Sequence, residues 1–236
     1  MAKTFLQAEW RKLAMVNYSV DKQLLDKYRP DKTEIDLWNN TCYVSLVGFK
    51  FKNTKLKGFK IPFHIDFEEV NLRFYVRYKD NGEWKRGVVF IKEIVPKPTL
   101  TFVANTVYKE NYQTMRMKHF WTLLNDNLTV EYKWKKKKWN SLKINADNSL
   151  TSIVKGSEEE FITEHYWGYT KISNKRTSEY RVEHPRWDIY KTRDYSIDVD
   201  FADIYGQEFD FLKNEKPKSV FLAEGSEIKV MNGQVI

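Results

Sequence analysis

One alternating segment of the sequence carries residue types suited to anion binding and proton transfer. Between positions 68 and 77, alternation places Glu69, Asn71 and Arg73 on one face of a predicted strand. A guanidinium matches a carboxylate with two parallel hydrogen bonds, and a glutamate beside it can donate or accept a proton. We therefore predict that Arg73 clamps a small carboxylate, with Asn71 and Glu69 beside it. The spacing also fits a strand face in water, where a Glu/Arg pair contributes about a few tenths of a kcal/mol.

A second concentration of reactive residue types lies at positions 164–169, which read Glu-His-Tyr-Trp-Gly-Tyr. A ligand pocket can use either face of such a strand, and we predict that His165 contributes to ligand binding. The alternative is an aromatic core layer with a hydrogen-bonded histidine. His64 and His184 stand at turn-like positions with the same ambiguity. Because no two histidines have the spacing of metal ligands, no metal site is predicted.

A run of four lysines, Lys135-Lys136-Lys137-Lys138, lies between two tryptophans. Cations interleaved with aromatic rings are typical of surfaces that bind single-stranded nucleic acid, where phosphates meet ammonium groups and bases stack. The same composition is typical of a solvated hairpin end that protects a sheet edge. Both interpretations stay open at this stage, and neither a phosphate-binding loop nor a serine-hydrolase motif accompanies the run.

Composition narrows the class of protein. The chain has 236 residues, 42% of them hydrophobic, with a net charge of +8 and a single cysteine, Cys42. It can bury a sizeable core, cannot form an internal disulfide and has no uncharged apolar run long enough to span a membrane. We therefore predict one domain over residues 1–236, in a reducing cytoplasmic compartment, with no membrane partner and no cofactor.

The elements that must position these residues are mostly strands. Residues 68–77 and 84–95 form a predicted hairpin around the turn sequence Asp80-Asn81-Gly82. Short helices are predicted at residues 21–28 and after the capping box formed by Ser157 and Glu160. The fold class is mainly β (α+β), a closed or nearly closed antiparallel barrel with a few short helices. Further strands are predicted at residues 42–51, 99–108, 128–134, 180–184 and 219–230.

Several strings of the sequence strongly resemble the YqjF-like family, a domain of unknown function. The resemblance covers nearly the whole chain. The strings are Ala8-Glu9-Trp10-Arg11, residues 43–49, Ile61-Pro62-Phe63-His64, residues 67–77 and 86–96, Tyr108-x-Glu110-x-Tyr112, residues 161–169, Glu179-Tyr180-x-Val182-x-His184-Pro185-x-Trp187 and Ala223-Glu224-Gly225-Ser226.

The resemblance implies a fold similar to acetoacetate decarboxylase, a mostly antiparallel β-cone around a buried cavity. In those decarboxylases a lysine forms a Schiff base with a β-keto acid, next to a second lysine that lowers its pKa. Their Gly-x-Pro-Lys-Lys pattern falls here on Lys109-Glu110-Asn111-Tyr112-Gln113. Tyr112 and Gln113 therefore stand where the two amines are expected, and neither can form an imine. The resemblance thus implies the fold without the Schiff-base reaction.

We expect the cavity to bind a small carboxylated or keto organic molecule. Arg73 or Arg86 is the predicted anion anchor, Asn71 and His165 are predicted lining residues, and Glu69, Glu110 and Tyr112 are candidate acid/base groups. An enzyme, lyase-like on a small organic acid, and a sensor remain alternatives. A different class of function is an interaction module for nucleic acid or protein that uses the four lysines. A third is a structural domain whose own aromatic side chains fill the cavity.

Overall fold

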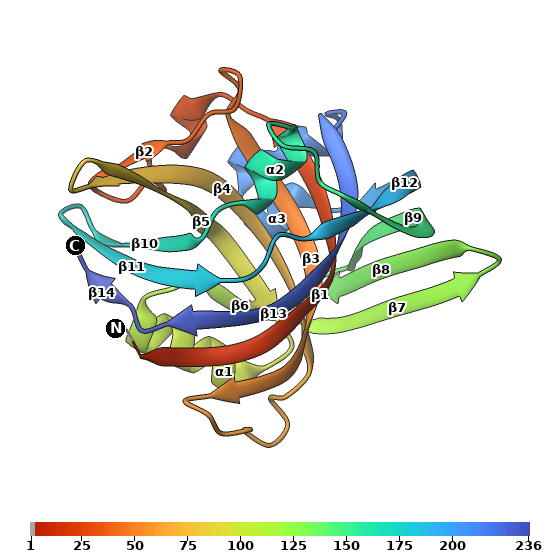
Figure 1. Ribbon diagram of the computed structural model, residues 1–236, viewed down its shortest axis with the longest axis horizontal. Coiled ribbons are helices and arrows are strands. Elements are labelled where there is room, and N and C mark those ends of the chain that lie inside the picture. Colours follow the sequence, from red (N-terminus) through yellow and green to blue (C-terminus); the bar gives the residue numbers. More distant parts are fainter. Residues whose placement is uncertain (1–2) are drawn as a thin grey trace.

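The computed structural model describes residues 3–236, most of them in long antiparallel strands with short helices between (Figure 1). The strands are β1 (Thr4–Ser19), β2 (Thr33–Ile35), β3 (Tyr43–Leu56), β4 (Phe67–Asp80), β5 (Glu83–Val95), β6 (Tyr112–Thr114), β7 (Arg116–Leu124), β8 (Asn127–Lys135), β9 (Trp139–Ser152), β10 (Trp167–Ser173), β11 (Arg176–Glu183), β12 (Asp188–Asp198), β13 (Ser219–Met231) and β14 (Gln234–Val235). The helices are α1 (Pro98–Val103), α2 (Glu158–Thr163) and α3 (Phe201–Tyr205), with the short 3-10 or π-helical segments η1 (Lys22–Leu25), η2 (Ala104–Tyr108) and η3 (Gln207–Lys213). The predicted mainly β class is confirmed.

The strands form one sheet that closes on itself. Its order runs β11-β10-β5-β4-β3-β1-β13, and an additional pairing between β11 and β13 joins the two ends into a cone-like ring. Strands β12, β9, β8 and β7 continue from β13 and extend away from the ring as an arm (Figure 1). Closure removes two sheet edges and encloses an interior that the strands line with alternate side chains.

Strand β4 shows why both faces of the ring wall are buried. Its Val70, Leu72 and Phe74 side chains point outward into a core that includes Tyr132 and Phe201, from the arm and from α3. The opposite face, which begins with Glu69, therefore points into the ring. An alternating strand usually exposes its polar face, but here the arm and α3 occupy the outer, apolar side.

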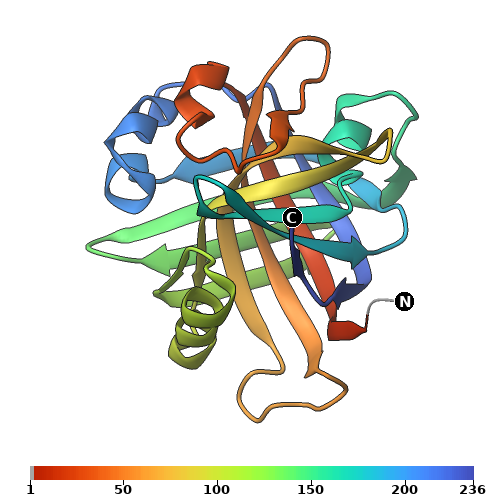
Figure 2. The same ribbon diagram turned by 90° about the vertical axis from the view of Figure 1, so that its left-hand side faces the viewer.

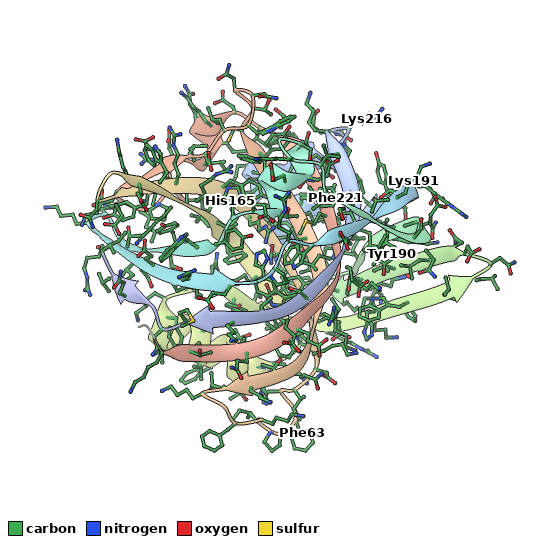
Figure 3. The ribbon with its side chains drawn as sticks, in the orientation of Figure 1. Phe63, His165, Tyr190, Lys191, Lys216 and Phe221 are labelled. Atoms are coloured by element: carbon green, nitrogen blue, oxygen red, sulfur yellow. The ribbon has the colours of Figure 1, made fainter. Side chains whose placement is uncertain are left out.

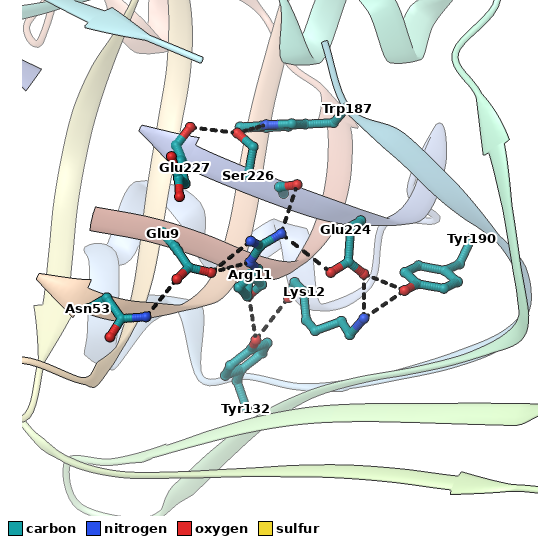
Figure 4. Close-up of polar contacts among 11 residues, drawn as sticks. Glu9, Arg11, Lys12, Asn53, Tyr132, Trp187, Tyr190, Glu224, Ser226 and Glu227 are labelled. Atoms are coloured by element: carbon teal, nitrogen blue, oxygen red, sulfur yellow. Dashed lines mark hydrogen bonds and ion pairs between the residues drawn. The ribbon is translucent and has the colours of Figure 1, made fainter. Parts of the chain in front are cut away.

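A polar network fastens the arm to the ring near the middle of β1 (Figure 4). The Lys12 ammonium donates to the carboxylate of Glu224 on β13 and to the hydroxyl of Tyr190 on β12. The Tyr132 hydroxyl on β8 donates to the Lys12 carbonyl at 2.8 Å. Gly225 has a φ of +82°, and a Cβ there would lie 2.0 Å from the Trp10 carbonyl oxygen, so the close β1–β13 approach requires glycine.

One predicted strand is wrong. Residues 99–108 form α1 and the wider turn η2 instead. Pro98 occupies the first helical turn, where its fixed φ favours a helix and its missing N–H is not needed. That local signal outweighs the β-branched composition of the segment, because strand preference depends mainly on packing. The capping box is confirmed in part: the Ser157 hydroxyl accepts from the Glu160 amide at 3.2 Å, but the Glu160 carboxylate accepts from the Gly156 amide at 2.6 Å and not from that of Ser157.

Over residues 3–236, none of the helices combines the length and the apolar composition that crossing a bilayer requires.

Candidate functional site

The ring encloses a cavity of about 330 Å³, within the usual range of small-molecule sites. Most of its lining is apolar and aromatic, so a ligand body that lies against these walls is desolvated. These side chains include Trp10, Phe49, Phe51, Phe67, Phe90, Trp167 and Trp187.

A polar cluster interrupts this apolar lining on one wall of the cavity. We use the name for six residues from β4, β5, β6 and the turn before β6, all of which line the cavity: Glu69, Asn71, Arg73, Glu93, Glu110 and Tyr112.

Strand register brings this cluster together from positions far apart in the sequence. Asn71 on β4 lies opposite Glu93 on β5, and Glu93 lies beside Tyr112 on the parallel strand β6. Two hydrogen bonds tie the short strand β6 to η2: Asn105 Nδ2 donates to the Tyr112 carbonyl at 2.8 Å, and the Tyr112 amide donates to Asn105 Oδ1 at 2.7 Å. The predicted residues Glu69, Asn71, Arg73, Glu110 and Tyr112 therefore share one wall.

The three carboxyl groups of the cluster have raised pKa values. Burial raises the pKa of Glu69 to about 7, although hydrogen bonding from Asn71 Nδ2 at 2.9 Å opposes the rise. Burial likewise raises the pKa of Glu110 to about 7, against a hydrogen bond from the Thr170 hydroxyl. Burial, together with the charges of Glu110 and Glu69, raises the pKa of Glu93 well above its usual value. At neutral pH the cluster therefore presents protonated carboxyl groups beside ionised ones.

Tyr112 complements these carboxyl groups as a neutral donor. Burial and the neighbouring glutamates raise the pKa of its phenol well above the usual value, so the hydroxyl keeps its proton at neutral pH. The hydroxyl of Tyr180, which also lines the cavity, stays neutral for the same reasons.

Arg73 is the cation of the cluster. It is only 8% exposed, and its Nε has no hydrogen-bond partner. Within residues 3–236, no carboxylate oxygen lies within 4.0 Å of the guanidinium. Its neighbour in the structure is the ring of Tyr75, whose centroid lies 5.8 Å from Cζ. A buried guanidinium without a close ion-pair partner is costly, so this group is suited to an anion that enters the cavity.

His165 also lines the cavity, and it is fixed from behind by Asp36. Its Nε2 lies 3.2 Å from Asp36 Oδ2, and burial lowers the pKa of His165 to about 4, so the ring is neutral at pH 7. Burial opposes ionisation of Asp36, but the hydrogen bonds from His165 and Arg86 outweigh it and lower the pKa of Asp36. With its proton on Nε2, the ring leaves Nδ1, which has no hydrogen-bond partner, as an acceptor.

Arg86, the other predicted anion anchor, does not line the cavity. Its Nε donates to Asp36 Oδ2 at 2.6 Å, and its guanidinium lies over the Phe161 ring with 4.8 Å between Cζ and the centroid. Sequence spacing could not show this, because Asp36 is remote in the chain and belongs to no recognisable motif. Arg86 thus lies outside the cavity lining and positions His165 through Asp36.

Glu93 is the member of the polar cluster that sequence reasoning missed. It follows the apolar run of β5 beside Lys92, and a charged pair at a strand end is typical of an exposed terminus. Parity along the strand gave no signal, because an irregularity between Phe90 and Lys92 shifts the alternation: Val88 and Phe90 line the cavity before it, and Glu93 lines the cavity after it.

The four lysines lie at the hairpin between β8 and β9, away from the cavity. Two of them are partly neutralised, because Lys136 Nζ and Lys137 Nζ lie 3.2 Å and 3.4 Å from Asp203 Oδ1. Within the described part of the chain, no group of acidic, histidine and cysteine side chains has the geometry to hold a metal ion.

Comparison with solved structures supports the cone-like fold. Acetoacetate decarboxylase from Legionella pneumophila is similar to this chain with a TM-score of 0.67 at 12% identity, over 98% of this chain and 87% of its own. The enduracididine biosynthesis enzyme MppR complexed with pyruvate has a TM-score of 0.67 at 10% identity, over 100% of this chain and 91% of its own. An acetoacetate decarboxylase-like enzyme from Sphingomonas wittichii has a TM-score of 0.66 at 8% identity, over 98% and 92%. At these identities the likeness concerns the fold alone.

Sequence comparison then places the chain in a family. The uncharacterized protein YqjF of Bacillus subtilis is 25% identical over 185 residues, which are 76% of this chain and 73% of YqjF. The model of the DUF2071 family, described as an uncharacterized conserved protein, matches residues 7–227. This chain, with its acetoacetate decarboxylase-like fold, therefore belongs to the DUF2071 family and is YqjF-like.

Proposed function

We propose that the cavity binds a small organic acid that carries a keto or hydroxyl group next to an apolar body. The observation that carries the proposal is Arg73, a buried guanidinium whose Nε is unpartnered and which, over residues 3–236, has no carboxylate oxygen within 4.0 Å. The ligand's carboxylate would supply that missing charge and accept two parallel hydrogen bonds. The complex of the similarly folded MppR with pyruvate supports the same ligand class.

The neighbouring glutamates do not remove the need for an anion. Burial raises the pKa of Glu69 and of Glu110 to about 7, so near that pH both groups are partly protonated and only partly balance the arginine. A carboxylic acid ligand has an ordinary pKa several units lower and therefore enters as a full anion. Binding of the acid and protonation of the cluster favour each other, since protonation removes negative charge that would repel the incoming carboxylate.

The cluster also provides a proton donor and acceptor at working pH. A group whose pKa lies near 7 transfers protons most effectively at neutral pH. Glu69 and Glu110 meet that condition, with Tyr112 as a neutral donor to a carbonyl oxygen and His165 Nδ1 as an acceptor from a ligand hydroxyl. We propose that an ionised Glu69 or Glu110 takes a proton from the carbon next to the ligand's carbonyl and gives an enolate whose oxygen accepts a hydrogen bond from Tyr112. Loss of a β-hydroxyl as water, protonated by the other glutamic acid, then re-forms the carbonyl with a double bond beside it, which is a lyase-like elimination. A sensor uses the same contacts without turnover.

A thermal-shift panel tests the binding claim. Keto and hydroxy acids with small and with bulky apolar bodies are compared with neutral amides of the same shapes. A true ligand at about 100 times its dissociation constant stabilises by about 2.7 kcal/mol, which raises the melting temperature by roughly 5–10 °C in a domain of this size. The proposal expects that shift for acids with apolar bodies. A panel in which no acid raises the melting temperature above its amide would overturn it.

The chemistry proposed here involves no imine. Within the described chain, no lysine lines the cavity, and Tyr112 occupies the wall where the sequence pattern of the decarboxylases places an amine. We therefore expect borohydride, added together with pyruvate or acetoacetate, to leave the mass of the protein unchanged. Intact-mass spectrometry measures this, with a Schiff-base decarboxylase as the positive control. A reduced adduct on any lysine would contradict the proposal.

A further inference from the structure

Two surface segments expose large apolar side chains at the same end of the molecule. The first is the loop between β3 and β4, residues 57–63, which we call the mouth loop. The second is α1 with η2, which we call the mouth helix (Figure 2). Phe59 and Phe63 of the mouth loop are 74% and 87% exposed, and Phe102 and Val107 of the mouth helix are 68% and 65% exposed. Contiguous exposed apolar side chains of this size are typical of docking surfaces.

These two segments form the opening of the cavity. Ile61 of the mouth loop and Tyr108 of the mouth helix both line the cavity and are both exposed at the surface. Phe5 connects them, because the Lys57 amide donates to the Phe5 carbonyl at 2.8 Å and the Phe5 and Tyr108 rings lie 5.0 Å apart. Figure 3 shows Phe63 pointing away from the body beyond the end of the ring.

The charge around this opening is mainly positive. Residues 54–66 and 97–109 contain five lysines and one acidic residue, Asp66, whose carboxylate accepts from the Asn53 amide at the end of the loop. Exposed aromatic side chains combined with lysines are the pattern of a surface that inserts rings at a lipid interface and holds anionic headgroups. The five lysines are Lys55, Lys57, Lys60, Lys97 and Lys109.

The backbone of Phe63 supports a role for its side chain. Its φ is +65°, in the left-handed region that bulky residues rarely adopt. Glycine or asparagine would occupy this position with less strain, and the ring makes no buried contact that would compensate. Folding alone therefore does not explain the aromatic ring at this position, and a contact with a partner at the surface would.

We infer that the mouth loop and the mouth helix dock on an anionic lipid surface, with Phe59, Phe63 and Phe102 in the interface. A second copy of the chain fits less well, because a two-fold interface through this surface would bring its lysines against one another. Docking through these segments turns the opening of the apolar cavity toward the lipid. This proposal differs from the expectation of no membrane partner, and it does not depend on the ligand proposed for the cavity.

Vesicle co-sedimentation tests the inference with the full chain. We expect binding to phosphatidylcholine vesicles that contain phosphatidylserine, weakened by salt, and about tenfold less binding to phosphatidylcholine alone. The double variant Phe59→Ser, Phe63→Asn is expected to lose about tenfold in binding. Because asparagine suits a positive φ, this variant is expected to melt no lower than the wild type.

A control variant distinguishes docking through this surface from non-specific adsorption of exposed apolar side chains to vesicles. Phe120→Ser with Leu124→Ser removes two exposed apolar side chains from β7, on the arm, and is expected to bind vesicles like the wild type. Lack of vesicle binding by the wild type, or equal losses in both double variants, would overturn the inference. So would a wild-type dimer in analytical ultracentrifugation that the Phe59/Phe63 variant dissociates, because a second copy would then cover the surface.

Discussion

Replacing Arg73 with glutamine is expected to weaken binding of the organic acid by about a hundredfold or more. The guanidinium is buried in a largely apolar cavity, where a charged hydrogen-bonded pair is screened little by water. Glutamine removes the positive charge and leaves the ligand's carboxylate uncompensated. Arg73→Lys keeps the charge but not the two-pronged geometry, so an intermediate loss is expected. Calorimetric titration of each variant with one acid from the panel measures the effect.

The control for this experiment lies on the same strand. Arg77 also belongs to β4, but its guanidinium pairs with Glu34 at 3.1 Å and lies over the Trp84 ring outside the cavity. Arg77→Gln is therefore expected to bind the acid within about threefold of the wild type, since an exposed ion pair contributes little. If Arg73→Gln bound the acid as tightly as Arg77→Gln, the anion site would be elsewhere.

Replacing Glu69 with glutamine is expected to stabilise the ligand-free protein at pH 8. Burial raises the pKa of Glu69 in the folded state to about 7, above its value of about 4.5 in an unfolded chain. The folded state therefore binds more protons between these values, and the free energy of unfolding falls as the pH rises through them. The penalty is complete above pH 7 and corresponds to about 3 kcal/mol. Glutamine removes it while keeping an acceptor for Asn71.

The expected gain has a defined pH dependence. At pH 8 the melting temperature of Glu69→Gln should exceed that of the wild type by roughly 5–10 °C, and at pH 4 the two should be nearly equal. Glu83→Gln, at the exposed start of β5, serves as the control and should show no pH-dependent gain. A Glu69→Gln protein that melted below the wild type at pH 8 would show that the carboxylate is ionised and stabilising there. Stability lost to buried carboxyl groups is typical of functional sites.

The sequence predicted the strands well where alternation was strong and local. Residues 68–77 alternate cleanly and lie within β4, and Ser157 begins α2 through the contact that its spacing with Glu160 indicates. Residues 99–108 were misassigned because β-branched composition is a weak signal beside a proline in the first turn. Closure of the ring could not be derived from periodicity, since the β11–β13 pairing joins residues remote in sequence.

The polar cluster was predictable in part. Alternation alone placed Glu69, Asn71 and Arg73 on one face, but it could not decide between water and a lumen, because that depends on the arm that packs against the other face of β4. Arg86 has the residue type of an anion anchor, but only the folded chain shows that its guanidinium donates to Asp36. Glu93 enters the cluster through strand register, which a single sequence does not reveal.

The most direct test of the proposed function is a calorimetric titration of the wild-type protein with a keto acid that carries an apolar body, and with the methyl ester of the same compound. The two ligands share shape and carbonyl group and differ in the charge that Arg73 is proposed to hold. We predict saturable binding of one acid per chain and binding of the ester that is about a hundredfold weaker. Equal affinities for acid and ester would contradict an anion site at Arg73.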